Sequence, residues 1–378
     1  MREIFDYLRA RQEEMVALAR ELAVIESPSN RPETQGPVFD RLAAALEDAG
    51  LRTRRLPGRT SGGQLFAAPA RPRQSGAQLV VGHVDTVWPV GTLAEMPVEL
   101  RDGRLHGPGV YDMKAGLVQG VYAVRALRDL GLEPPLAPVF FVNSDEEVGS
   151  PESVRWIRRL ARRVRRVFVL EPSLGPEGRL KTARKGVLRY RVTIRGRAAH
   201  AGLEPEAGAS AVQELAHVVR ELYALAAPER GMTVNIGLIG GGQASNVVAP
   251  EAWAEVDLRV LHRADAEAFE RAFYGLTPEV PGTKIEIAGG MNRQPLEPNS
   301  RNRALWQAAE RCAGELGIEL GEGTAGGGSD GNFTSEFVAT LDGLGAVGDG
   351  AHAVHEHVVT ARMPERAALL AGLMLEPV

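Results

Sequence analysis

Short apolar segments alternate with segments of helical periodicity along the first half of the chain, and this alternation narrows the possible folds more than any other feature. Buried strands are expected at residues 78–81, 139–142 and 167–170, where apolar runs have the length of strands. Helices are expected at residues 4–25, 38–49, 113–130 and 152–163. Such an order predicts an α/β domain with helices on both faces of a mainly parallel sheet.

A different order of elements begins near residue 179. Strands and helices are expected there in the order β-α-β-β-α-β, at residues 187–194, 207–226, 232–239, 253–261, 265–273 and 284–288. That order is ferredoxin-like and makes a small domain with its own core. Helices return at residues 303–316 and 364–373, and a strand is expected at residues 344–347. We therefore predict a discontinuous α/β domain of residues 1–178 and 292–378, into which an α+β domain of residues 179–291 is inserted.

Composition excludes several classes of protein. The net charge of -4 gives no general attraction to nucleic acid or to anionic membranes, and the Arg-rich segment 155–166 is expected to be a solvated helix face and strand edge. Cys312 is the only cysteine, so no intrachain disulfide or thiolate metal cluster can form. We expect no signal segment, because residues 1–20 are charged and amphipathic, and no apolar run reaches the ~18 residues of a membrane span. We expect a soluble cytoplasmic protein without nucleic-acid or membrane partners.

Histidine and carboxylate residues follow the predicted strands. His83 and Asp85 come after the first strand, Glu146 and Glu147 after the second, and Glu171 after the third. In open α/β sheets, ligands bind at the carboxyl ends of the strands, so these side chains are expected to meet at one edge.

Two further candidates lie in Gly-rich turns. Asp112 stands in the segment Gly107–Lys114, and His352 follows Gly350. His355 and His357 crowd the same segment as His352, so spacing alone leaves three histidines open for one position.

These residue types suit a site for two metal ions. Imidazole nitrogen and carboxylate oxygen bind zinc, cobalt or manganese, and five ligands are too many for one tetrahedral site. Two ions that share a bridging carboxylate and a water would lower the pKa of that water and polarise a scissile carbonyl. Glu146 and Glu147 offer one ligand and one group to accept the proton, in either order. Asp85 could orient the imidazole of His83.

Together these motifs resemble the di-zinc metallopeptidase family of glutamate carboxypeptidase, aminoacylase, acetylornithine deacetylase and succinyl-diaminopimelate desuccinylase. The resemblance implies that His83 and Glu171 hold one metal ion, that Glu147 and His352 hold the other, and that Asp112 bridges them. It also implies that Glu146 is the general base and that Asp85 supports His83. Within the family, the ligand histidine precedes a glutamate by four residues, which selects His352 with Glu356.

Three motifs look most similar to the glutamate carboxypeptidase branch: residues 83–92, residues 196–202 and residues 326–330. Aminopeptidase-type relatives carry Asp at the position of Glu171, so recognition of a free amine is not expected. By the same resemblance, His200 would reach an active site, often that of the partner subunit, and stabilise the oxyanion. Asn246 and Arg259 would contact the substrate, and Arg259 would hold its terminal carboxylate.

Other interpretations of these residues remain open. His200 could be an ordinary loop residue, and Arg259 could pair with Asp257 or Glu255 on its own strand. The inserted domain is expected to form a homodimer interface.

The sequence therefore predicts a two-metal amide hydrolase that releases a C-terminal amino acid, with Glu or Asp expected, from a peptide or an N-acyl amino acid. An N-acyl-amino-acid deacylase with the same chemistry is the alternative. A non-catalytic binding protein of the same fold is disfavoured by Glu146, because a binding protein has no use for a general base. Zinc is the expected metal, with cobalt or manganese as alternatives.

Overall fold

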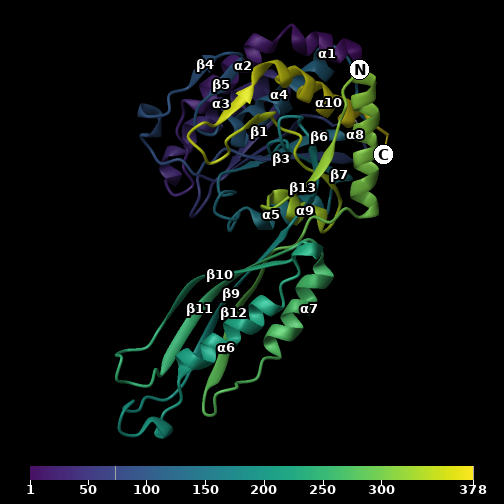
Figure 1. Ribbon diagram of the computed structural model, residues 1–378. Helices are drawn as coiled ribbons and strands as arrows, with labels where there is room; N and C mark the ends of the chain where they lie inside the picture. The colour runs from purple at the N-terminus through teal and green to yellow at the C-terminus, as the bar shows by residue number, and fades with distance from the viewer. Residues whose placement is uncertain (73, 378) are drawn as a thin grey trace. The chain divides into compact units, whose positions relative to one another are not determined.

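The computed structural model describes residues 1–72 and 74–377, which divide into two compact units (Figure 1). The first unit comprises Met1–Ala183, Pro298–Ala325 and Ser329–Val378. The second comprises Arg184–Glu297 with Gly326–Gly328. The second unit thus interrupts the first in sequence.

The first unit is built on a six-stranded sheet. Its strands, in the order in which they pair, are β1 (Leu51–Leu56), β2 (Gln64–Pro69), β6 (Ala137–Asn143), β3 (Ala77–His83), β7 (Arg166–Val169) and β14 (Ala339–Leu341). β3 runs parallel to both β6 and β7, and β7 runs parallel to β14. β1 and β2 form an antiparallel edge. The mainly parallel sheet predicted from the sequence is confirmed.

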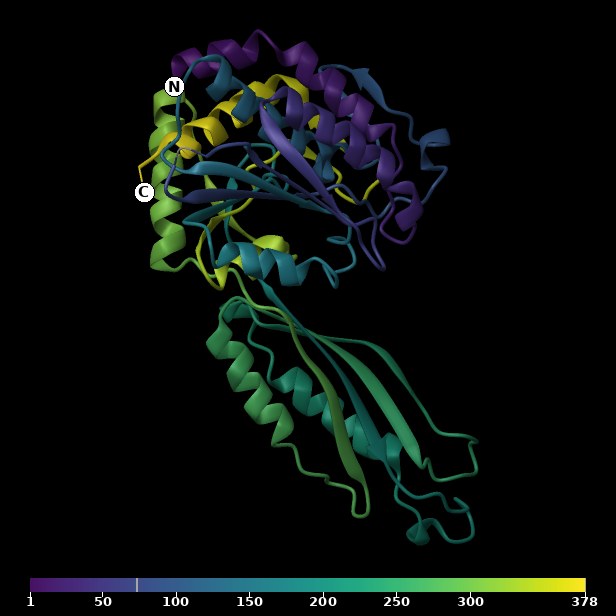
Figure 2. The same cartoon turned by 180° about the vertical axis from the view of Figure 1, so that it is seen from behind.

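Helices cover both faces of this sheet (Figures 1 and 2). Alternate residues of β3 point to opposite faces, so Val80 joins one apolar cluster while Leu79 and Val81 join another. The cluster of Val80 includes residues of α1 (Arg2–Arg9), α2 (Gln12–Ala23), α3 (Gly36–Asp48), α4 (Ala115–Asp129), α8 (Ser300–Leu316) and α10 (Met363–Leu375). The other cluster includes residues of α5 (Val154–Ala161) and α9 (Asp330–Ser335).

Two smaller sheets complete the first unit. One has the order β15 (Gly348–Asp349), β16 (His357–Val359), β5 (Arg104–His106) and β4 (Glu99–Arg101). The other pairs β13 (Glu322–Ala325) with β8 (Leu180–Arg184). Neither was predicted, because most of these strands are too short to show a period in the sequence.

The strand predicted at residues 344–347 is wrong. β14 ends at Leu341, and the apolar residues after it form a buried connection without a strand ladder. The backbone N–H of Gly345 donates to the carbonyl of Glu171 at 2.9 Å, and a Cβ on Gly345 would lie 2.2 Å from the carbonyl oxygen of Leu170. The apolar pattern correctly predicted that residues 344–347 are buried. This segment, however, packs closely against Leu170 instead of forming a strand of the sheet. The single helix predicted at residues 4–25 is likewise two helices, α1 and α2.

The second unit contains a four-stranded antiparallel sheet with two helices. Its elements follow the order β-α-β-β-α-β that the sequence indicated: β9 (Gly186–Arg195), α6 (Ala211–Ala224), β10 (Thr233–Gly241), β11 (Glu251–Val260), α7 (Arg263–Tyr274) and β12 (Lys284–Arg293). The strands pair in the order β10-β11-β9-β12, which is the ferredoxin-like arrangement. Apolar residues of α6 and α7 pack with the sheet in a separate core.

No helix among the described residues has the length and apolar character needed to cross a membrane.

Two glycines of α4 bring this helix close to the end of β7. A Cβ on Gly116 would lie 2.3 Å from the carbonyl oxygen of Leu170, and one on Gly120 would lie 2.8 Å from the Leu170 side chain. Since Leu170 precedes Glu171 and α4 follows Asp112, this contact sets the spacing between two candidate ligands.

We expect Gly116→Ala to lower the free energy of unfolding by about 1–3 kcal/mol, because the methyl group has no room beside Leu170. Gly314→Ala is the matched control in α8, where a Cβ meets nothing within 4 Å. That variant should raise the free energy by up to about 1 kcal/mol, since alanine favours a helix over glycine. Urea denaturation measures the free energy of unfolding of both variants. Equal changes in the two variants would contradict the close approach of α4 to Leu170.

Candidate metal centre

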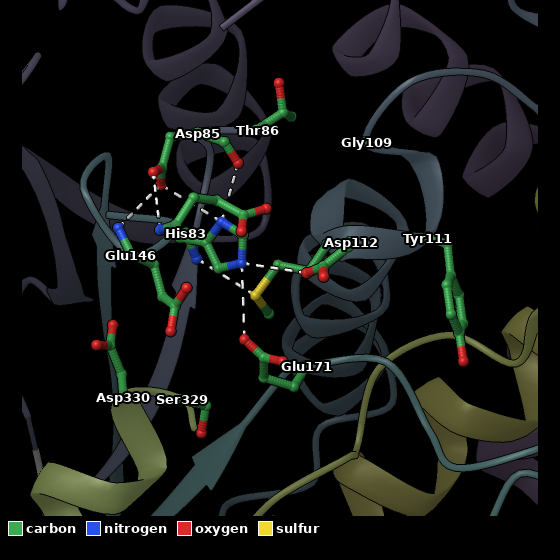
Figure 3. Close-up of polar contacts among 12 residues, drawn as sticks. His83, Asp85, Thr86, Gly109, Tyr111, Asp112, Glu146, Glu171, Ser329 and Asp330 are labelled. Carbon is green, nitrogen blue, oxygen red and sulfur yellow. Dashed lines mark hydrogen bonds and ion pairs between the residues drawn. The ribbon is translucent and has the colours of Figure 1, made fainter. Parts of the chain in front are cut away.

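His83, the last residue of β3, lies at the centre of the site (Figure 3). Its side chain is buried, and Nδ1 lies 3.0 Å from the carbonyl oxygen of Asp85. A carbonyl can only accept, so Nδ1 carries a proton, and Nε2 can present a lone pair. Nε2 lies 3.3 Å from Oδ1 of Asp112 and 3.6 Å from Oε1 of Glu171.

The contact between His83 and Asp112 fits a metal ion. Nε2 of His83 and Oδ1 of Asp112 are buried, and neither has a hydrogen-bond partner of normal geometry among the described residues. Buried polar atoms nearly always have partners, so two unsatisfied acceptors that converge indicate ligands of a cation. Burial lowers the pKa of His83, but its contacts with Asp112, Asp85 and Glu171 outweigh burial and hold that pKa well above its usual value. A proton can therefore stand in for a metal ion here.

Asp112 contacts both candidate histidines. Its Oδ1 lies 3.3 Å from Nε2 of His83, and its Oδ2 lies 3.5 Å from Nε2 of His352. Although burial raises the pKa of Asp112, these two histidines lower it far below its usual value. A carboxylate with one oxygen toward each imidazole has the geometry of a bridging ligand.

The turn that carries Asp112 is held by Glu356. One oxygen of this buried carboxylate accepts from the N–H groups of Tyr111 at 2.9 Å and Asp112 at 3.1 Å. The other accepts from the N–H of Gly109 at 2.9 Å and from the indole of Trp88 at 2.8 Å. In the sequence, Glu356 served only to select His352 among three histidines. Its contacts with the distant Asp112 turn could not be predicted from the sequence.

Glu146 and Glu147 lie in the turn after β6, and Asp85 holds this turn. The Asp85 carboxylate accepts from the N–H of Glu146 at 3.2 Å and of Glu147 at 3.1 Å, and from Ser29 Oγ at 2.7 Å. Its Oδ1 lies 3.4 Å from Nδ1 of His83, farther than its own carbonyl oxygen. Asp85 therefore joins the imidazole to the glutamate turn, a wider role than the sequence predicted.

His352 is the histidine of its segment that meets the site. Its Nε2 lies 3.1 Å from Oε2 of Glu147, and its backbone φ of 61° is left-handed. Hydrogen bonds with Asp112 and Glu147 raise the pKa of His352 to about 10, and burial raises the pKa of Glu147 to about 8. By contrast, His355 lies near Asp349, and His357 is the first residue of β16.

Two groups of residues bring ligand atoms within 4.8 Å of one another. One comprises His83, Asp112 and Glu147, and the other His83, Glu146 and Glu171. The five predicted ligands and the predicted base thus converge on one region of the first unit. The assignment of each ligand to one metal ion stays a prediction. So does the assignment of Glu146 as base and Glu147 as ligand.

Lys181 was missed by sequence reasoning. This residue of β8 is 10% exposed at its side chain, and its Nζ lies 4.0 Å from Oε2 of Glu171. A buried ammonium group beside several carboxylates offsets part of their negative charge. Nothing in the local sequence distinguishes Lys181 from the basic residues around it.

The remaining predicted residues belong to the second unit. Nδ1 of His200 accepts from the N–H groups of Gly202 at 3.1 Å and Leu203 at 3.2 Å, so the ring proton lies on Nε2. The neighbouring N–H of Ala201 donates to the carbonyl of Asn246 at 3.0 Å, which puts these two loops side by side.

Arg259 is paired with Asp257, as one interpretation of the sequence allowed. Its Nε and Nη2 donate to the two carboxylate oxygens of Asp257 at 2.6 and 3.0 Å. A role of Arg259 in substrate binding stays a prediction.

The chain has relatives among known proteins. A model of peptidase family M20/M25/M40 matches residues 79–376. The chain belongs to this family. It is similar to carboxypeptidase G2 of Pseudomonas sp. (strain RS-16), with 27% identity over 79% of this chain and 73% of that protein. Succinyl-diaminopimelate desuccinylase of Delftia acidovorans is also 27% identical, over 89% of this chain and 92% of the relative.

Solved structures show the same fold. Aminopeptidase PepT from Bacillus cereus superposes with a TM-score of 0.80 at 21% identity, over 96% of this chain and 98% of that one. A dinuclear metal-binding M20 peptidase from Bacillus subtilis gives a TM-score of 0.71 at 15% identity, over 97% of this chain and 98% of that one. Membership in the M20/M25/M40 family confirms the resemblance drawn from the motifs, and the protein is a metal-dependent hydrolase of that family.

Metal binding is expected to strengthen as the pH rises. His352 with a pKa of about 10 is protonated at neutral pH in the metal-free protein, and that proton must leave before Nε2 can bind a metal ion. Since His83 also holds a proton in the metal-free protein, the apparent association constant should rise about tenfold per pH unit for each proton that metal binding releases, His352 contributing one of them between about pH 6 and pH 9.

Calorimetry of zinc binding in buffers of different ionisation enthalpy measures the released protons. His352→Ala should release about one proton fewer than the wild type. The control His217→Ala, whose ring pairs with Glu279 in the second unit, should leave that number unchanged. An unchanged proton count in His352→Ala would contradict the assignment of His352 as a ligand.

Proposed function

We propose that this protein is a two-metal amide hydrolase that releases a C-terminal amino acid from a peptide or an N-acyl amino acid. The observation that supports it is the position of Asp112, with one carboxylate oxygen toward His83 and the other toward His352. A single metal ion needs no such bridge, and Glu171 and Glu147 supply one further carboxylate on each side. Two metal ions bound there would polarise a carbonyl and lower the pKa of a water.

Glu146 is proposed as the general base. Its side chain is buried, and its backbone is held by Asp85, so the carboxylate has a restricted position beside His83 and Glu171. From this position it accepts the proton of the attacking water and delivers it to the leaving nitrogen. Glu147, which contacts His352, is proposed as the ligand of the pair.

His200 is proposed to donate a hydrogen bond to the oxyanion of the tetrahedral intermediate. Two backbone N–H groups hold Nδ1 as an acceptor, so the proton lies on Nε2, where it can be donated to a substrate. For this role the second unit, or that of a partner subunit, must bring His200 to the metal centre.

Arg259 is proposed to hold the terminal carboxylate of the substrate, with Asn246 as a further contact. Asp257 engages Nε and Nη2 of Arg259 and thereby holds the plane of the guanidinium. The hydrogens on Nη1 lie outside that pair and can serve a carboxylate.

Deacylation of an N-acyl amino acid is the alternative. The curated relatives include both a carboxypeptidase and desuccinylases at similar identity, and an arginine that holds an α-carboxylate suits either reaction. The choice between them is made by a kcat/KM comparison of dipeptides and N-acyl amino acids that share the same C-terminal residue.

The test of the mechanism is Glu146→Gln in zinc-loaded protein. We expect kcat for an N-acyl-glutamate or dipeptide substrate to fall by about 10²–10⁴-fold, because the amide cannot accept the proton of the water. Zinc binding should persist, since Glu146 is proposed as a base and not as a ligand.

Glu336→Gln is the control for that test, because it removes a carboxylate that pairs with Arg158 on the surface. It should keep the wild-type kcat. Full turnover by Glu146→Gln would overturn the proposed base, and the absence of turnover of any amide by the wild type would favour a binding protein.

We also propose that the second unit forms a homodimer through β10. This strand pairs with β11 on one side and is an edge of its sheet. Leu238 and Ile239, adjacent in β10, are 61% and 64% exposed. An uncovered apolar edge strand can pair with the same strand of a second copy, which satisfies its backbone groups and buries these side chains.

Leu238→Lys should therefore weaken the dimer, because a charge would be buried at the interface. Light scattering with size-exclusion chromatography over a dilution series gives the mass of each species. Val24→Lys, at a side chain in the first unit that is 48% exposed, is the control and should leave the mass unchanged. A wild-type protein that is monomeric at all concentrations would contradict the proposed dimer.

A further inference from the structure

A row of four potential ligands crosses the small sheet β15-β16-β5-β4 of the first unit. Glu99 of β4 lies opposite His106 of β5, His106 lies opposite His357 of β16, and His357 lies opposite Asp349 of β15. Side chains directly opposite each other on antiparallel strands share one face, with Cβ atoms about 4.5–5.5 Å apart. Two imidazoles thus stand side by side with a carboxylate next to each, and we call these four residues the histidine ladder.

The two imidazoles have the spacing of ligands on one metal ion. Their ring centres are 5.1 Å apart, and their planes are tilted by 33°. Two imidazoles bound to one tetrahedral zinc ion through Zn–N bonds of ~2.0–2.1 Å have ring centres roughly 5 Å apart. Rotation of the side chains would direct one nitrogen of each ring to a shared ion.

The tautomer of His357 and the lowered pKa of His106 both favour metal binding. Nδ1 of His357 lies 2.9 Å from the carbonyl oxygen of His355, so Nδ1 carries the proton and Nε2 presents a lone pair. A histidine that donates its second nitrogen to a carbonyl is the usual form of a metal ligand. Burial, with Arg101, His357 and Arg104, lowers the pKa of His106, so this ring is neutral at neutral pH.

The carboxylates of the histidine ladder are exposed, and they would complete the coordination by turning toward the imidazoles. Oδ1 of Asp349 accepts from the N–H of Gly350 at 2.8 Å, and its Oδ2 lies 3.9 Å from Nε2 of His355. Glu99, beside His106, is also exposed. A hydrated ion can therefore reach the ladder directly from solvent.

The histidine ladder is separate from the metal centre. None of its residues belongs to either group of potential ligands around His83 that the described residues form. Glu356 precedes His357, and its buried carboxylate binds the turn of Asp112 while His357 faces the ladder. An ion on the ladder would hold β16 to β5 and thereby stabilise the segment that carries Glu356.

We propose that the histidine ladder binds a further divalent transition-metal ion, of the zinc, copper and nickel class that imidazole prefers, through His106 and His357. Glu99, Asp349 or water supplies the remaining ligands. This site adds to the proposed hydrolase activity and does not depend on it.

The test is a zinc titration of metal-free protein in competition with a chromophoric chelator. We expect the wild type to bind one equivalent more than either His106→Gln or His357→Gln, whatever number the metal centre takes. His262→Gln is the matched control, because this exposed histidine of the second unit lies near Glu297 and should keep the wild-type number. Circular dichroism checks that each variant is folded. Equal zinc numbers in the wild type and both ladder variants would overturn the proposal.

A second measurement on the wild type keeps the test decisive if a variant does not fold. One equivalent of Cu²⁺, which imidazole ligands bind more tightly than Zn²⁺, is added to zinc-loaded protein to replace the zinc of the ladder, and electron paramagnetic resonance reports the nitrogens bound to it. Coupling to two imidazole nitrogens is the expected result. A signal without nitrogen coupling, or one that His106→Gln leaves unchanged, would show adventitious binding and refute the site.

Discussion

Carboxylates that accept hydrogen bonds from backbone N–H groups are the interaction on which this structure depends. Asp85 accepts from two consecutive amides of the Glu146–Glu147 turn, and Glu356 accepts from three amides of the turn that holds Asp112. The Glu146–Glu147 turn lies outside the described helices and strands, and Asp112 departs from helical φ and ψ within the short π-helical segment Val110–Lys114. The anionic oxygens make these bonds strong, and burial shields them from water. The proposed ligands and the proposed base therefore stand on backbone that is held before any metal ion binds.

The same region concentrates negative charge out of water. Asp112, Glu147 and Glu171 surround His83, whose imidazole also contacts the Asp85 carboxylate. Like charges at these distances cannot all persist without cations, because burial makes their repulsion costly. Protons on His83 and His352 and the ammonium of Lys181 offset part of this charge in the metal-free protein. The repulsion among these buried carboxylates is unfavourable in the metal-free protein, and bound cations would reduce it, as expected of a metal-binding site.

The two units divide the proposed work. The first unit supplies the groups for metal binding and proton transfer, while the second contains the residues proposed to meet the substrate. His200 and Arg259 are each held by a local contact, namely the amides of Gly202 and Leu203 and the carboxylate of Asp257. These contacts set the tautomer of one side chain and the plane of the other before a substrate arrives. Such preorganisation lowers the cost of ordering side chains on binding.

Sequence alone determined what is encoded locally: the α/β alternation, the ferredoxin-like order of the second unit, and the residue types that follow each strand. These follow from periodicity and from residues adjacent in the chain, which is why His83, Glu146, Glu147 and Glu171 could be singled out. Tertiary structure alone decided the hold of Glu356 on the Asp112 turn, the position of Lys181, the pairing of Arg259 with Asp257 and the histidine ladder. Each of these depends on contacts between separate strands or turns, or on a choice between several partners. The strand expected at residues 344–347 failed for the same reason: an apolar pattern records burial, whereas close packing against Leu170 is set by a distant segment.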